Sequence, residues 1–456
     1  MSSVAVGRLP PGVSAVPQVP PLLTFSVMLG AMTFNMALCF VNTRIGGVGN
    51  GAIIGCEIVI IGMVLLLSYT VIDYPRFITV SSVLLYLIVL AAVRTVFHGE
   101  GIQIKPARDL LIPIAFFFFG MRSPDIRRAD ALVGTAAAVV VLVGVLEYAF
   151  PDRFTELFNI ARFYIDRGAM SVGQSSQSSN LFISGVRPDA LGGRNLLPFL
   201  GDHRVSSVFL EPISAGNFGI VIFMWALVRS RATHRIFWGT FAAAATMIVL
   251  SDSRFGAMFC IAATAIAFLP VSLGAAVAAG LPAVALAALI FLPEHLEKLH
   301  VIGNGFVSRL ILSGRFIAAL DLQNWFGVMT PDFQPFDSGY AYSFISFGIV
   351  GAAALWVMLW LIRGRGGWQF ASYRNLVGAY YAVLLCVSNS PYTIKTASLL
   401  WFLLGVLSAA CDPAVGVSRG SPYQRRALGT ASVLQPLPSS GSASRRQSVR
   451  AQARRR

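Results

Sequence analysis

The feature that most constrains this chain is a succession of apolar segments, each close to the length that crosses a lipid bilayer. A membrane-spanning helix needs about 20 predominantly apolar residues. Twelve segments approach or meet this length: 22–41, 51–71, 77–97, 107–121, 129–150, 211–228, 236–251, 255–270, 273–292, 342–362, 374–391 and 395–411. Because the bilayer core offers no water to backbone amides, such spans form helices. The sequence therefore predicts an all-α polytopic integral membrane protein with about 12 transmembrane helices. The number could be 10, because 107–121 is short and interrupted by Pro113, and 255–270 and 273–292, the latter with Pro282, are barely separated.

The composition excludes several other classes. The chain is 56% hydrophobic and only 12% charged, which is the balance of a polytopic membrane protein rather than a soluble domain. Nine arginines between Arg419 and Arg456 supply much of the net charge of +15. We interpret them as a basic tail lying against anionic lipid, not as a nucleic-acid surface. The five cysteines include no Cys-x-x-Cys, so neither a disulfide framework nor a zinc site is predicted.

Lys and Arg in the short loops predict the orientation, because they are enriched on the cytoplasmic side. With the N-terminus inside, the inner loops carry Arg76, Arg122, Arg127, Arg128, Arg229, Arg231, Arg235, Arg363, Arg365 and Arg374. The outer short loops carry only Arg44, Lys105, Arg108, Arg254 and Lys395. Both termini are therefore predicted to be cytoplasmic.

This orientation divides the chain into seven parts. In order they are a Pro-rich N-terminus (1–21), helices 1–5 (22–151), a long periplasmic loop (152–210), helices 6–9 (211–292), a second periplasmic loop (293–341), helices 10–12 (342–411) and a disordered basic cytoplasmic tail (412–456). We expect the first loop to be mostly irregular. In the second loop, Glu294 to His300 predicts a short amphipathic helix.

Unusual polar residues gather on the predicted outer side. Arg204 and Glu211 stand where the first loop enters a span, and Arg254 follows the seventh span. The second loop contributes Arg315 and, at its end, Asp337. Guanidinium groups bind phosphate oxygens bidentately and remain charged at any physiological pH. These arginines and carboxylates therefore suit a diphosphate headgroup at the membrane surface.

The same residues carry a family resemblance. The motifs are Arg204-Val-Ser-Ser-Val-Phe-Leu-Glu-Pro-Ile-Ser-Ala-Gly-Asn217, Ser251-Asp-Ser-Arg254, Ser313-Gly-Arg315, Trp325-Phe-Gly327, Asp337-Ser-Gly-Tyr340 and Phe347-Gly-Ile-Val-Gly351. In order and spacing they resemble the Wzy-type polysaccharide polymerases of the O-antigen ligase and polymerase superfamily, and are most similar to the xanthan-type exopolysaccharide polymerases. The resemblance covers about 200–355, and the rest of the chain only through its topology.

The resemblance implies a membrane glycosyltransferase of the bacterial inner membrane. Its substrate would be an oligosaccharide repeat unit linked to undecaprenyl diphosphate, and its product an exopolysaccharide on the outer face. No cofactor and no metal are implied, whereas a flippase and a chain-length regulator are implied as partners. Arg204, Arg254 and Arg315 would bind the diphosphate, and Glu211 or Asp337 would act as the catalytic base. Tyr340, Arg309 and His203 are further candidates for substrate binding.

Each candidate also has a structural interpretation. Arg204 suits an interfacial arginine that reaches toward headgroups, and Glu211 suits a helix cap before Pro212. Asp337 lies in a Gly-containing turn, where Asp is common. Within the spans, Glu57, Arg94 and Glu147 are expected mainly to pair with one another.

Three other functions remain open from the sequence. The ligase branch of the superfamily usually shows a His where this chain has Phe336-Asp337-Ser338, and the missing His argues against a ligase function. A flippase or transporter should show repeated halves and polar residues at mid-membrane, and neither is apparent. A scaffold for an envelope complex is the third alternative.

Overall fold

The computed structural model describes residues 18–101, 103–170, 180–182, 184–187, 196–298, 306–335, 337–362 and 364–410. These residues are almost entirely helical, and they contain no β-strand beyond an isolated bridge between Val186 and His203. The basic tail, the first 17 residues and most of the Ser- and Gln-rich tip of the first loop lie outside the described residues. The predicted all-helical class is confirmed.

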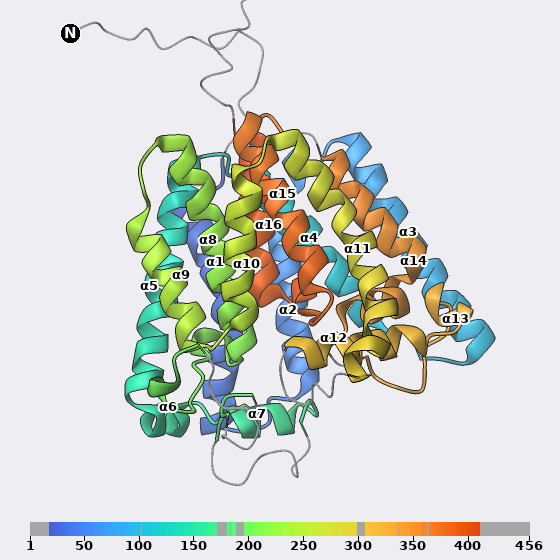
Figure 1. Ribbon diagram of the computed structural model, residues 1–456, viewed down its shortest axis with the longest axis horizontal. Coiled ribbons are helices and arrows are strands. Elements are labelled where there is room, and N and C mark those ends of the chain that lie inside the picture. The colour runs from blue at the N-terminus through green and yellow to red at the C-terminus, as the bar shows by residue number, and fades with distance from the viewer. Residues whose placement is uncertain are drawn as a thin grey trace, which may run out of the picture. The chain divides into compact units, whose positions relative to one another are not determined.

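The helices follow one another in the order shown in Figure 1. They are α1 (Pro21–Arg44), α2 (Asn50–Ser68), η1 (Tyr69–Val71), α3 (Tyr74–His98), α4 (Ile104–Arg122), α5 (Ile126–Ala149), α6 (Pro151–Leu157), α7 (Ile160–Asp166), η4 (Pro198–Leu200), η5 (Ser207–Phe209), α8 (Pro212–Thr233), α9 (Trp238–Leu250), α10 (Arg254–Phe268), α11 (Val271–Lys298), α12 (Phe306–Ala318), α13 (Leu322–Trp325), α14 (Gly339–Leu361), α15 (Gly367–Leu384), η6 (Ser390–Tyr392) and α16 (Ile394–Ala409). Each of the twelve predicted apolar segments overlaps one of these α-helices, although 374–391 extends past the end of α15 at Leu384.

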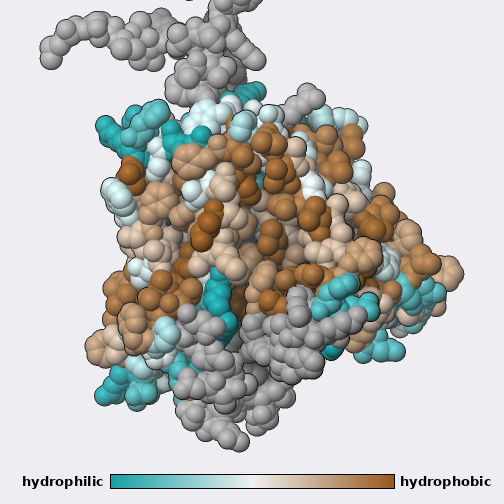
Figure 2. All heavy atoms as spheres, viewed as in Figure 1, coloured by the Kyte–Doolittle hydropathy of each residue, from teal (hydrophilic) through white to brown (hydrophobic). Residues whose placement is uncertain are grey.

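Seven helices among the described residues are long and apolar enough to cross a membrane: α1, α2 with η1, α3, α5, α8, α11 and α14. Three further apolar helices, α9, α10 and α16, are shorter. Figure 2 shows apolar side chains over most of the middle of one face, with hydrophilic residues gathered toward its upper and lower margins. This distribution is the one a lipid bilayer requires of the surface that it covers.

Helix α8 lies at the centre of the helical bundle, and α3 and α11 lie at its periphery. In α8, 83% of the apolar window is buried inside the protein, against 11% in both α3 and α11. Helices α4 and α16 also pack closely, because Gly120 and Gly405 bring their backbones together. A Cβ on Gly120 would overlap the Phe402 carbonyl, and one on Gly405 would overlap the Phe117 carbonyl. Small residues of this kind allow close helix crossings in membranes.

Helix α14 is broken at Gly348, where φ is 65° and the backbone is not helical. Side chains of α3 bind backbone carbonyls in and beside this break. Arg94 donates to the carbonyls of Gly327 and Ile345, and the hydroxyl of Tyr86 donates to Phe347 at 2.8 Å. The buried Arg94 therefore satisfies backbone acceptors, which broken helices in membranes require.

Several elements differ from the predicted ones. Helix α11 continues through Pro293 to Lys298, beyond the predicted end of its apolar segment at 292. The expected amphipathic helix at Glu294 is the end of α11, and His300 lies outside the described residues. Instead α12 is the amphipathic helix, with Ile311 and Ile317 buried and Arg315 exposed. The first loop is also more ordered than expected, since it contains α6 and α7.

The expected mutual pairing of Glu57, Arg94 and Glu147 is wrong as well. Glu57 pairs with Arg108, and Arg94 binds carbonyls at the break in α14. Glu147 accepts hydrogen bonds from the turn that precedes η5. Each charge finds a partner on a different element, because helix packing and not span membership decides which residues meet.

Candidate functional site

A largely buried ion pair lies at the end of the bundle where α6, α7 and α12 lie, here called the α7 end (Figure 1, lower part). Glu211, immediately before α8, lies 3.0 Å from the Nζ of Lys395 in the first turn of α16. The Oγ of Ser214 donates to Glu211 at 3.0 Å, and the hydroxyl of Tyr164 on α7 donates to the same carboxylate. Lys395 is only 6% exposed. The carboxylate therefore ties α7, α8 and α16 together.

The partners of Glu211 determine its charge state. Burial by itself raises the pKa of this carboxyl group, but the Lys395 ammonium and the Tyr164 hydroxyl outweigh burial and hold the pKa below its ordinary value. Burial, followed by the negative charge of Glu211, raises the pKa of Tyr164 well above its usual range. Near neutral pH, Glu211 is therefore ionised and Tyr164 is a protonated donor.

We expect the stability gained from Glu211 to depend on pH in one direction. A carboxyl whose pKa is lower in the folded protein stabilises it fully above the ordinary value of 4.5, and this stabilisation disappears as the pH falls through the lower folded value. The wild type should therefore unfold at a higher temperature than Glu211→Gln at pH 7, and the difference should close only below about pH 4.5. Thermal unfolding of both proteins from pH 7 to pH 3 tests this. A difference that closes between pH 7 and pH 5 would contradict it.

A second charged group lies at the start of α4. Arg108 pairs with Glu57 of α2 and with its neighbour Asp109, whose Oδ1 is 2.6 Å from its Nη2. The hydroxyl of Tyr342 on α14 donates to the other oxygen of Asp109 at 2.5 Å. The ammonium of Lys105 lies 4.5 Å from the centre of the Tyr342 ring. We call the Glu211 and Arg108 groups together the polar cluster.

Arg204, which was predicted to bind the diphosphate, lies outside the polar cluster, beside the turn that contains Asp252. Arg204 is 4% exposed and donates to the carbonyls of Ser251 and Ser184, each at 3.0 Å. Asp252 pairs with Arg187 at 3.2 Å and is itself buried. These bonds fasten the first loop to the turn between α9 and α10. The described contacts therefore give Arg204 a role in holding the loop, which differs from the interfacial role considered above.

The remaining predicted arginines lie on two further helices. Arg254 is the first residue of α10 and is half-buried, directly after the Asp252 turn. Arg309 and the exposed Arg315 both belong to α12. Arg309 lies 3.3 Å from Asp337, whose side chain is 46% exposed. The structure thus brings together Arg309 and Asp337, and places Arg204 and Arg254 beside the same turn.

Two other predicted residues have clear structural contacts. The Nε2 of His203 lies 3.3 Å from the buried carboxylate of Glu147. The hydroxyl of Tyr340 donates to the Ala382 carbonyl at 2.9 Å, while its side chain lines a cavity. His203 therefore lies beside a carboxylate that orders a turn, and Tyr340 contributes to the wall of the cavity.

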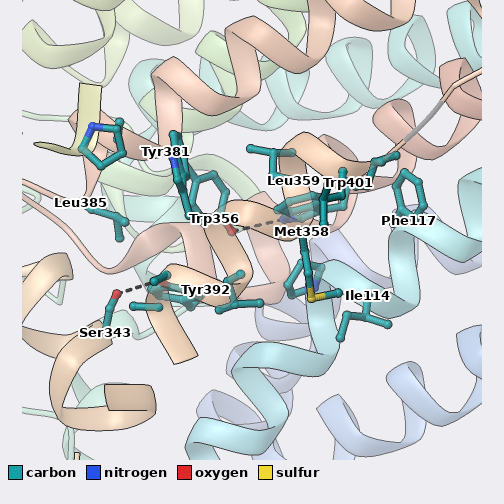
Figure 3. Close-up of a pocket in the computed structure, with 18 of the residues that line it drawn as sticks. Ile114, Phe117, Ser343, Trp356, Met358, Leu359, Tyr381, Leu385, Tyr392 and Trp401 are labelled. Carbon is teal, nitrogen blue, oxygen red and sulfur yellow. Dashed lines mark hydrogen bonds between the residues drawn. The ribbon is translucent and has the colours of Figure 1, made fainter. Parts of the chain in front are cut away.

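The cavity has a volume of about 730 Å³ and lies between α3, α4, α11, α14, α15 and α16. Its lining is mainly apolar, with Ile114, Phe117 and Leu359 among the residues in Figure 3. Ser343 and Tyr392 supply polar groups and hydrogen-bond to each other at 2.7 Å. The Tyr392 ring lies 5.8 Å from that of Tyr342, which binds Asp109. Tyr342 and Tyr392 therefore link the polar cluster to the cavity.

Most residues of the polar cluster do not stand out in the sequence. Lys395 and Lys105 are predicted only as loop charges, and Tyr164 belongs to no motif. The adjacent Arg108 and Asp109 at the start of a weak span were the available signal, because charges near a span are rarely accidental. Within the described ranges, no three His, Cys, Asp or Glu side chains come together as metal ligands.

In comparisons with known proteins, no family model, no curated protein and no solved structure matches this chain.

Proposed function

We propose that this chain is a membrane glycosyltransferase that polymerises oligosaccharide repeat units carried on undecaprenyl diphosphate. It would act at the outer face of a bacterial inner membrane, with twelve spans, both termini in the cytoplasm, and the α7 end outside. The motif resemblance between 204 and 351 and the bias of Lys and Arg toward the other end of the bundle support this proposal.

The observation that carries the proposal is the apolar cavity beside the polar cluster. A polyprenyl diphosphate has a long apolar chain and a doubly charged head, so a protein that binds it needs an apolar recess next to cations. The cavity of about 730 Å³ lies within the usual size range of ligand pockets. Arg108, Lys105 and Lys395 lie in the adjoining cluster. Both parts of such a substrate thus have matching surfaces in neighbouring positions.

The reaction would be a displacement at the anomeric carbon. A hydroxyl of the acceptor repeat unit attacks this carbon, the bond to the diphosphate oxygen breaks, and the hydroxyl proton passes to a carboxylate. Of the two candidate bases, Asp337 is the more accessible, and Arg309 holds it at 3.3 Å. Glu211 is already bound by Lys395, Tyr164 and Ser214. We therefore assign Asp337 as the base and Glu211 as a positioning residue.

The test uses the purified protein in liposomes with an undecaprenyl-diphosphate-linked repeat unit and no nucleotide sugar. We expect a ladder of lengthening glycans, and a loss of roughly 100-fold or more in its rate for Asp337→Asn. The matched control is Asp332→Asn, an exposed carboxylate of the same segment, which should leave the rate unchanged. Movement of the lipid across the bilayer without a ladder would favour a flippase instead. A normal rate for Asp337→Asn would overturn the assignment of the base.

A further inference from the structure

Two tyrosines in the polar cluster each donate a hydrogen bond to a carboxylate. The hydroxyl of Tyr164 donates to Glu211, and the hydroxyl of Tyr342 donates to Asp109. Each carboxylate also has a cation of its own, since Lys395 pairs with Glu211 and Arg108 pairs with Asp109. The two carboxylates are therefore already neutralised before any further charge is considered.

A further cation lies on the ring of each tyrosine. The guanidinium carbon of Arg167, directly after α7, is 4.9 Å from the centre of the Tyr164 ring, and the Lys105 ammonium is 4.5 Å from that of Tyr342. Aromatic faces attract cations but do not neutralise them. Neither cation forms an ion pair with a carboxylate in the part of the chain that the structure describes. The Nε of Arg167 is buried without a hydrogen-bond partner there.

The segment at the start of α16 links the two groups. Lys395 donates to the Tyr164 hydroxyl at 3.4 Å, and the ring of Tyr392, three residues earlier, lies 5.8 Å from that of Tyr342. The whole cluster contains four cations, Lys105, Arg108, Arg167 and Lys395, and only three carboxylates, Glu57, Asp109 and Glu211. One positive charge is therefore left over among these residues.

An incoming ligand can reach this excess charge. Lys105 is exposed and Arg167 is half-buried, whereas Lys395 and Asp109 are buried. Placing two cations near each other is unfavourable unless an anion lies between them. Arg offers two parallel N–H donors to a phosphate, and Lys offers a mobile point charge. The aromatic rings hold both cations in position without using their charge.

We propose that Lys105 and Arg167 form a binding site for the phosphate groups of a lipid-linked diphosphate. The inference rests on the proposed function for the identity of the natural ligand, and it assigns the diphosphate to these two residues instead of to Arg204. Tyr342 connects the site to the cavity, because its ring neighbours the cavity-lining Tyr392. A polyprenyl chain in the cavity would thus end with its diphosphate beside Lys105 and Arg167.

The test measures the binding of inorganic pyrophosphate by calorimetry, with the full chain in nanodiscs of neutral lipid. We expect Arg167→Met and Lys105→Met each to weaken binding about tenfold, and the double variant to abolish it. The matched control is Arg162→Met, because Arg162 is an exposed arginine of the adjoining helix α7 and pairs with Asp166 at 3.5 Å. It should bind as the wild type does. Arg167→Lys, which keeps the charge, should recover part of the affinity.

Two further comparisons distinguish a diphosphate lipid from other anionic lipids, and the anion site from the proposed function. Undecaprenyl diphosphate should compete with pyrophosphate more strongly than phosphatidylglycerol does, and equal competition would overturn the assignment to a diphosphate lipid. Wild-type affinity in a correctly folded double variant, judged by its thermal unfolding, would overturn the site itself. If pyrophosphate binding is lost as expected but the wild type forms no glycan ladder, the site stands and the proposed function fails.

Discussion

Replacing Lys395 by methionine is expected to lower the free energy of unfolding by about 3 kcal/mol and to abolish polymer formation. The substitution leaves the carboxylate of Glu211 without its ammonium partner, which lies 3.0 Å away in the wild type. Breaking a buried ion pair by removing one partner is costly, because the other charge remains desolvated. Lys395 also donates to the Phe209 carbonyl at 3.3 Å, so the turn before α8 loses a contact as well. Denaturant unfolding in lipid or detergent and the glycan ladder assay measure the two effects.

The double variant Glu211→Gln with Lys395→Met is the control for this prediction. It removes both charges together, so it should recover most of the stability lost in Lys395→Met. Lys395→Arg keeps the positive charge and should lose less than the methionine variant. If the single and double variants are equally unstable, the loss is due to packing of the side chain and not to the unpaired charge.

Replacing Glu147 by leucine is expected to lower the free energy of unfolding by about 4 kcal/mol, because it removes the acceptor for a buried turn. The carboxylate of Glu147 is fully buried and accepts from the backbone N–H of Ser206 at 3.0 Å and from that of Ser207. It also accepts from the Ser206 hydroxyl at 2.9 Å. Ser207 has a positive φ of 51°, which residues other than glycine rarely adopt. The carboxylate thus stabilises an unfavourable turn that connects Arg204 to Glu211.

Thermal unfolding of Glu147→Leu, Glu147→Gln and Glu156→Gln tests this role. Glu147→Gln keeps an acceptor but loses the charge, so it should lie between the wild type and the leucine variant. Glu156 is an exposed residue of α6, and its replacement should leave stability unchanged. If Glu147→Leu unfolds at the wild-type temperature, the turn is held by the surrounding packing instead. A stable but inactive variant would place Glu147 in catalysis.

The candidate site shows which of its residues stand out in the sequence and which do not. Arg309 and Asp337 are separate candidates in the sequence, and they form an ion pair in the structure. Glu211 stands out as a charge directly before a long apolar helix, whereas its partners Lys395 and Tyr164 do not stand out. Lys105 and Arg167, which carry the proposed anion site, were not predicted as site residues. Whether Arg204, Arg254 and Arg315 contact a diphosphate stays a prediction.

The sequence by itself determined that the chain is helical and where its apolar helices run. This information is local, because a run of apolar residues has only one common way to satisfy its backbone in lipid. Exact helix ends depended on local packing as well, which is why α11 extends beyond the predicted boundary at 292.

Only the tertiary structure decided which charges meet. Lys395 reaches Glu211, and Asp109 reaches Tyr342, across segments that are far apart in the chain. These distances depend on how closely the helices cross, and Gly120 and Gly405 set one such crossing by allowing the backbones of α4 and α16 to touch. Helix packing therefore determines which residue pairs with a given charge. The position of that charge in a span or a loop does not identify its partner.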